Sequence, residues 1–111
     1  MSDVRAMLVG KVNDVWTRRI ETISSDALGE GEVLIAVEYS CINYKDGLST
    51  TEKGKVARID PLIPGVDLAG TVIESSDPSV AVGSQVIAHG NDIGVAHHGG
   101  FATMARVPAK W

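Results

Sequence analysis

The sequence predicts a mainly β domain with tight turns and only short helical turns. Twelve glycines and four prolines divide the chain into short runs rich in valine and isoleucine, a pattern typical of strands joined by turns. Apolar residues alternate most clearly between Glu32 and Ile42, and no segment shows the apolar period of a helix of ordinary length. We therefore expect strands to build the core.

The first expected unit is a β-hairpin. Arg5–Val9 and Val15–Ile23 are predicted as its two strands. The chain is expected to turn near Asn13-Asp14, because these residue types tolerate the backbone of a two-residue hairpin turn.

The clearest predicted strand covers Glu32–Ile42. Its alternate residues fall on opposite faces of a sheet, and both faces are apolar as far as Glu38, which is expected of a central strand. Cys41 alternates with Tyr39 and is therefore expected to be a small buried residue and not a nucleophile.

The rest of the chain predicts three further strands. Asn43–Lys55 is polar and fits a short helical turn followed by a loop. Val66–Ser75 is the next strand, and its Ala69-Gly70 pair has so little side-chain bulk that another backbone or a ligand can approach closely. Val86–Ala88 and Gly100–Val107 are the last two strands.

Composition excludes several classes of protein. The chain has 111 residues, enough for one domain, and a formal net charge of −4 with scattered basic residues, which argues against a nucleic-acid groove or an anionic membrane surface. Its single cysteine cannot form an internal disulfide, and no apolar run is long enough for a signal peptide or a membrane span. A reducing cytoplasm is the expected location.

The glycines do not form a nucleotide-binding pattern. Neither Gly-x-Gly-x-x-Gly nor Gly-x-x-x-x-Gly-Lys-Ser/Thr occurs, and a βαβ unit needs a helix that the sequence does not predict. We therefore expect residues 1–111 to form one domain and the dinucleotide-binding domain to be absent from this chain.

Three segments, in order, resemble the medium-chain dehydrogenase/reductase superfamily in its N-terminal domain. They are Cys41-Ile42-Asn43-Tyr44-Lys45-Asp46-Gly47, Pro64-Gly65-Val66-Asp67-Leu68-Ala69-Gly70-Thr71-Val72 and Val82-Gly83-Ser84-Gln85-Val86-Ile87. Lys53-Gly54-Lys55 and the stretch from Gly94 to Gly100 are similar to the acrylyl-CoA reductase and quinone oxidoreductase branch. The resemblance implies a GroES-like, partly open β-barrel.

The departures from zinc-dependent relatives imply a zinc-independent protein. Aligning on Asp46 puts Asn43 where those enzymes carry a cysteine ligand, and Val66 stands where they carry a histidine. A catalytic zinc needs three protein ligands, and only Asp67 remains as a candidate, so no metal site is expected.

The resemblance implies the substrate-side half of a reductase that moves a hydride from NADPH to the β-carbon of an α,β-unsaturated carbonyl compound, either an acrylyl-CoA-like thioester or a quinone. The implied catalytic residues are Tyr44, Lys45 and Asp67, and Asn43 and Tyr44 are implied to contact the nicotinamide. The residues alone leave alternatives open. Asn43 and Asp46 fit turn caps, and so does Asp67. Tyr44 fits a core residue, and Lys45 fits a solvated loop.

The histidines give weaker signals. His97 and His98 are adjacent, so their side chains are expected to diverge and not to hold a metal together; His97 is the better site candidate, and His89 is expected to be structural.

The rival interpretation is a stand-alone GroES-like module that binds or forms oligomers without catalysis, which ring assembly in solution would reveal. Under either interpretation, a bare edge or apolar face is expected to favour homo-oligomers.

Overall fold

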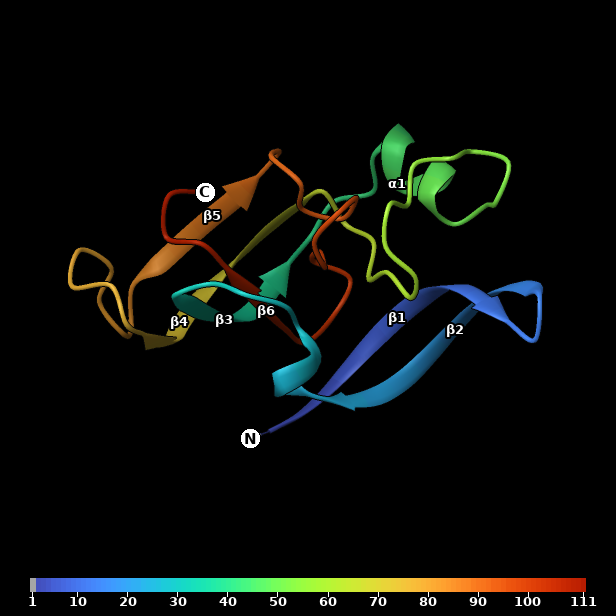
Figure 1. The fold of residues 1–111 in the computed structure, drawn as a ribbon. Helices are drawn as coiled ribbons and strands as arrows, with labels where there is room; N and C mark the ends of the chain where they lie inside the picture. The colour runs from blue at the N-terminus through green and yellow to red at the C-terminus, as the bar shows by residue number, and fades with distance from the viewer. Residues whose placement is uncertain (1) are drawn as a thin grey trace.

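The computed structural model describes residues 2–111, which form two antiparallel sheets and two short helices (Figure 1). The elements are β1 (Asp3–Val12), β2 (Val15–Ser24), η1 (Ser25–Ala27), β3 (Val33–Tyr39), α1 (Tyr44–Ser49), β4 (Asp67–Ser75), β5 (Gln85–His89) and β6 (Met104–Val107). Neither helix in this part of the chain is long and apolar enough to cross a membrane. The predicted mainly β fold is confirmed.

The hairpin β1–β2 turns where the sequence predicted. Asn13 and Asp14 have φ angles of 52° and 64°, the two positive values that a type I′ turn requires. Both strands run longer than predicted. The indole Nε1 of Trp16 donates to the carbonyl of Thr50 at 2.7 Å, which fastens the hairpin to the segment after α1.

The larger sheet has the strand order β5-β4-β3-β6, so β3 lies in its interior. Val33 and Ile35 of β3 are buried in one apolar cluster, which includes Leu68, and Leu34 is buried in the other. Both faces of β3 therefore contribute to the core, as expected of a central strand. The strand ends at Tyr39, three residues before the predicted end at Ile42.

Short bridges join the two sheets. The amide of Met7 donates to the carbonyl of Phe101 at 2.9 Å, Val9 and Leu62 exchange two backbone hydrogen bonds, and the amide of Thr103 donates to the carbonyl of Arg5. These contacts are isolated and do not form a continuous ladder. The result is the partly open, GroES-like barrel that the resemblance implied.

Gly70 permits the close approach predicted for its segment. A Cβ atom at this position would lie 2.1 Å from the carbonyl oxygen of Ala36. The neighbour is the backbone of β3, which pairs with β4 through Val37 and Gly70. The Ala69-Gly70 pair thus serves strand packing here.

His98 connects the loop before β6 to the segment before β4. Its Nδ1 accepts a hydrogen bond from the backbone amide of Ile63 at 3.0 Å, which requires a ring without a proton on Nδ1. Burial lowers the pKa of His98, and the neighbouring His97 lowers it further. The folded protein therefore holds this proton less tightly than the unfolded chain does.

We expect acid to destabilise the fold through His98. Because the pKa is lower in the folded state, this contribution to stability is complete above about pH 6.5 and is lost as the pH falls toward the folded value. The measurement is Tm between pH 7.5 and 5.5. His98→Gln should reduce the decrease in Tm as the pH falls, and His89→Gln, at an exposed histidine, should not. If Tm decreases as much in His98→Gln as in the unmodified protein, the acid destabilisation arises from other groups.

Candidate functional site

The side chain of Asn43 lies between two carboxylates. Its Nδ2 donates to Asp46 Oδ2 at 3.2 Å and to Asp67 Oδ2 at 3.1 Å, and its backbone amide donates to Asp46 Oδ2 at 2.9 Å. The other oxygen of Asp67 accepts from the backbone amide of Cys41 at 2.9 Å. Both hydrogens of the Asn43 amide are thus held by carboxylates, which fixes the orientation of this side chain.

Asp46 caps α1 and also binds a second segment. The helix begins with a capping box between Asn43 and Asp46, which confirms the expectation that Asp46 caps a turn. Its Oδ1, however, accepts from the amides of Gly65 and Val66 at 3.1 and 3.0 Å, and the residue is only 1% exposed. One buried carboxylate therefore fixes the Asn43 turn against the segment that leads into Asp67. Sequence reasoning missed this second role.

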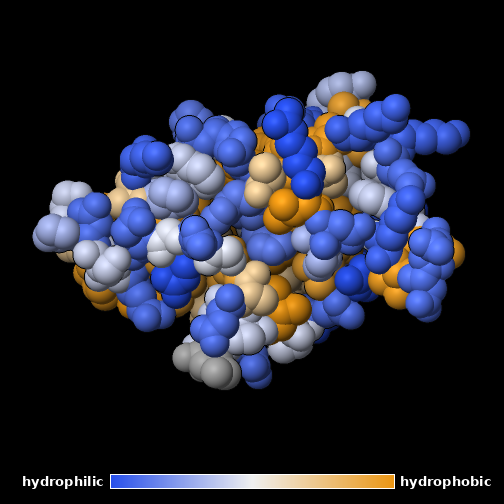
Figure 2. Space-filling view, in the orientation of Figure 1, coloured by the Kyte–Doolittle hydropathy of each residue, from blue (hydrophilic) through white to orange (hydrophobic). Residues whose placement is uncertain are grey.

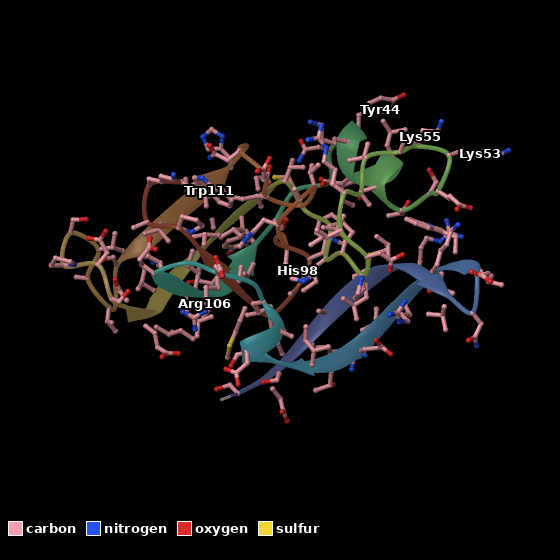
Figure 3. All side chains as sticks on the ribbon, in the orientation of Figure 1. Tyr44, Lys53, Lys55, His98, Arg106 and Trp111 are labelled. Atoms are coloured by element: carbon pink, nitrogen blue, oxygen red, sulfur yellow. The ribbon has the colours of Figure 1, made fainter. Side chains whose placement is uncertain are left out.

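Tyr44 and Lys45 project from the first turn of α1 into solvent. Tyr44 is 84% exposed, so the alternative that it packs in the core is wrong. Figure 3 shows its side chain pointing away from the body of the molecule, and Figure 2 shows apolar atoms at the surface beneath α1. The phenol and the ammonium group are therefore free to meet a ligand.

Two cavities flank the Asn43–Asp67 hydrogen bond. One, which we call the Asn43 cleft, has a volume of about 220 Å³. Its lining residues are Asn43, Lys45, Val66, Gly90, Asn91, Ile93 and Val95. The other measures about 340 Å³ and is lined by Tyr39, Ser40, Cys41, Asp67, Leu68, Ala69, Ile87 and His89. Asn43 and Lys45 therefore line one cavity, Asp67 lines the other, and Tyr44 lines neither.

The burial predicted for Cys41 is wrong. Its side chain is exposed at the rim of the larger cavity. The alternation that predicted burial holds only inside a strand, and β3 ends two residues earlier, at Tyr39.

The residues at the zinc-ligand positions do not fit zinc. The amide nitrogen of Asn43 donates to carboxylates and cannot coordinate a cation, and Val66 has no ligand atom. No group of three His, Cys, Asp or Glu side chains suited to a metal ion occurs within residues 2–111.

The two adjacent histidines serve different segments. His97 Nε2 lies 2.6 Å from the carbonyl oxygen of Arg106, and its ring meets Trp111 edge-on at 5.1 Å, whereas His98 binds Ile63. The contacts of His97 are with β6 and the C-terminal turn and not with the Asn43 cleft.

The sequence is similar to that of several known proteins. The family model for the alcohol dehydrogenase GroES-like domain matches residues 29–111. The acrylyl-CoA reductase AcuI of Ruegeria pomeroyi is 45% identical over 92 residues, covering 83% of this chain and 28% of that protein. YhfP of Bacillus subtilis, which carries the name of a quinone oxidoreductase, is 44% identical over 107 residues, covering 96% of this chain and 32% of that protein.

Two solved structures have the same fold. The yhdH oxidoreductase of Salmonella enterica in complex with NADP superposes with a TM-score of 0.91 at 37% identity, covering 96% of this chain and 33% of that one. Bacillus subtilis yhfP with NAD bound superposes with a TM-score of 0.94 at 42% identity, covering 100% of this chain and 34% of that one. This chain spans about a third of the length of these relatives.

Proposed function

This chain belongs to the alcohol dehydrogenase GroES-like domain family, and from that premise we propose that it is the substrate-side domain of a nicotinamide-dependent reductase of α,β-unsaturated carbonyl compounds. The dinucleotide-binding domain would be a separate part of the whole protein. An acrylyl-CoA-like thioester is the proposed substrate, with a quinone as the alternative.

The observation that carries the proposal is the partly buried hydrogen-bond network around Asn43. Asp46 and Asp67 hold both amide hydrogens of Asn43 and fix the turn from which exposed Tyr44 projects and at which Lys45 lines the Asn43 cleft. Because these groups are already oriented, the protein does not have to rearrange them when negative charge develops on the substrate during the reaction.

The proposed roles follow from the chemistry of each side chain. The nicotinamide, when bound, supplies the hydride that reaches the β-carbon. The Tyr44 phenol donates a hydrogen bond to the substrate carbonyl, and Lys45 adds positive charge where the enolate oxygen develops. Asn43 and Tyr44 contact the nicotinamide, and Asp67 holds the Asn43 amide in place.

Three finer properties belong to the same proposal. NADPH is the proposed cofactor; solved relatives contain NADP or NAD. A cytoplasmic location fits a chain with one free, exposed cysteine. Self-association fits the exposed apolar side chains of Tyr39, Ile42 and Ile87.

Zinc independence is the first test. Protein purified without chelator is expected to contain far less than one equivalent of zinc by elemental analysis, because Asn43 and Val66 replace two ligands. One tightly held equivalent would contradict this part of the proposal.

Tyr44→Phe tests the role of the phenol in a full-length reductase that carries this chain. We expect the loss of one hydrogen bond to cost about 1–3 kcal/mol in the transition state, measured as a lower kcat/KM, while Tm stays the same because Tyr44 is exposed. Unchanged kcat/KM with a lower Tm would make Tyr44 a structural residue.

A further inference from the structure

Four cations gather on the segment that begins in α1 and follows it. Of the ten lysines and arginines in a chain of net charge −4, Lys45, Lys53, Lys55 and Arg58 lie within this stretch, which we call the basic loop. Its acidic neighbours are engaged elsewhere. Asp46 is buried and hydrogen-bonded, Glu52 forms an ion pair with Lys11 of β1 at 2.7 Å, and exposed Asp60 accepts from the backbone amide of Lys11 at 3.0 Å.

The charges of the basic loop are available to a ligand. All four side chains are exposed, and none joins an ion pair within residues 2–111. Figure 3 shows Lys53 and Lys55 extending from the loop beyond α1, and Figure 2 shows hydrophilic side chains projecting there. Such a local surplus of charge on an acidic protein favours a small anionic ligand.

The backbone that carries Lys53 and Lys55 is held in one shape. A Cβ on Gly54 would lie 2.2 Å from the carbonyl oxygen of Leu48, so the turn packs directly on the end of α1. The Gly54 amide donates to Thr51 Oγ1 at 3.1 Å, and Lys55 has a φ of 54°, a left-handed backbone that few side chains adopt. An ordered turn presents its charges at a lower entropic cost than a mobile loop does.

The basic loop is continuous with the Asn43 cleft. Lys45 lines the cleft, and the backbone amide of Arg58 donates at 2.9 Å to the carbonyl of Val95, which also lines it. The first cation of the basic loop, Lys45, therefore lies at the cleft, and the backbone of the last, Arg58, is bonded to a residue that lines it.

We propose that Lys53, Lys55 and Arg58 of the basic loop bind the phosphate groups of a coenzyme A thioester whose acyl end enters the Asn43 cleft beside Lys45. This inference rests on the proposed reductase function and chooses between its two substrates. Coenzyme A carries a diphosphate and a 3′-phosphate on a flexible arm that ends at the thioester, so it matches cations outside the cleft. A quinone is neutral and would leave these cations unused. Lysine and arginine bind phosphate through charge-assisted hydrogen bonds.

The phosphate groups of NADPH are the alternative ligand for the basic loop. A binding experiment distinguishes them from the phosphate groups of coenzyme A. Backbone amide shifts of this chain are followed at low ionic strength during titration with coenzyme A, pantetheine or 2′,5′-ADP. Coenzyme A is expected to shift the amides of Lys53, Gly54 and Lys55, and pantetheine is not. Tighter binding of 2′,5′-ADP than of coenzyme A would overturn the proposal.

Matched variants test whether position or total charge matters. K53Q/K55Q should weaken coenzyme A binding about fivefold or more, and R18Q/K110Q, which removes two exposed cations elsewhere, should weaken it less than about twofold. Equal weakening in both variants would overturn the proposal, because it would show a nonspecific charge effect.

Kinetics of a full-length reductase that carries this chain separate failure of this inference from failure of the proposed function. The two substrates are acrylyl-CoA and the acrylyl thioester of N-acetylcysteamine, which has no phosphate. The ratio of their kcat/KM values should favour acrylyl-CoA and fall about fivefold in K53Q/K55Q. Equal use of both thioesters would overturn the inference and leave the reductase function standing. Reduction of neither would contradict the function, while the binding result would still stand on its own.

Discussion

Replacing Asp46 with alanine is expected to lower the free energy of unfolding by about 3–5 kcal/mol. The carboxylate accepts hydrogen bonds from two groups of Asn43 and from the amides of Gly65 and Val66, and it is almost completely buried. Removing it leaves these donors without an acceptor and opens a cavity beneath α1. Urea unfolding of the 111-residue chain, followed by tryptophan fluorescence, measures the loss.

The control for Asp46→Ala is Asp77→Ala. Asp77 also accepts hydrogen bonds from a neighbouring turn, through Ser79, but it is only half-buried, whereas Asp46 is almost completely buried. Its replacement should cost much less. Hydrogen exchange of the Gly65 and Val66 amides should accelerate in Asp46→Ala well before global unfolding, because their shared acceptor is gone. Equal losses in the two variants would show that the Asp46 network contributes no more than a surface turn.

The isolated chain is expected to fold but to show no NADPH-dependent reductase activity. In nucleotide-binding domains the phosphates are anchored by a glycine-rich turn at a helix N-terminus, and the sequence contains no such pattern. The remaining contacts, one side of a nicotinamide pocket, should give an affinity no better than roughly millimolar, about −4 kcal/mol.

Calorimetric titration of NADPH into the chain measures this affinity, and a full-length reductase titrated in parallel provides the reference. A dissociation constant in the micromolar range, or measurable reduction of acrylyl-CoA by the chain alone, would show that this domain holds a dinucleotide site of its own.

Local chemistry made much of the fold predictable. The turn at Asn13-Asp14 was predictable because both residues accept a positive φ. The interior position of β3 in the sheet was predictable because both of its faces are apolar. The error at Cys41 arose at a strand end, where alternation no longer constrains the side chain.

Long-range contacts could not be predicted in the same way. Asp46 binds Gly65 and Val66 on a distant segment, and His97 meets Trp111, and no local pattern encodes either contact. The turn at Asn43 was predictable because its capping box is local. The Asn43 bond to Asp67 was not, because it depends on how β4 packs beside β3.

The interior position of β3 also has a consequence for how fast the chain acquires its structure. One neighbour, β4, follows after the long loop that contains α1, and the other, β6, is the last strand, so that Val33 pairs with Val107. Closing such loops costs entropy before the distant contacts form. Folding of chains rich in distant strand pairings therefore takes about milliseconds to seconds. The β1–β2 hairpin, whose partners are sequence neighbours, can form within about microseconds. Before β6 pairs with β3 during folding, one edge of β3 has no hydrogen-bonding partner. A strand from another molecule can then pair with β3 in place of β6.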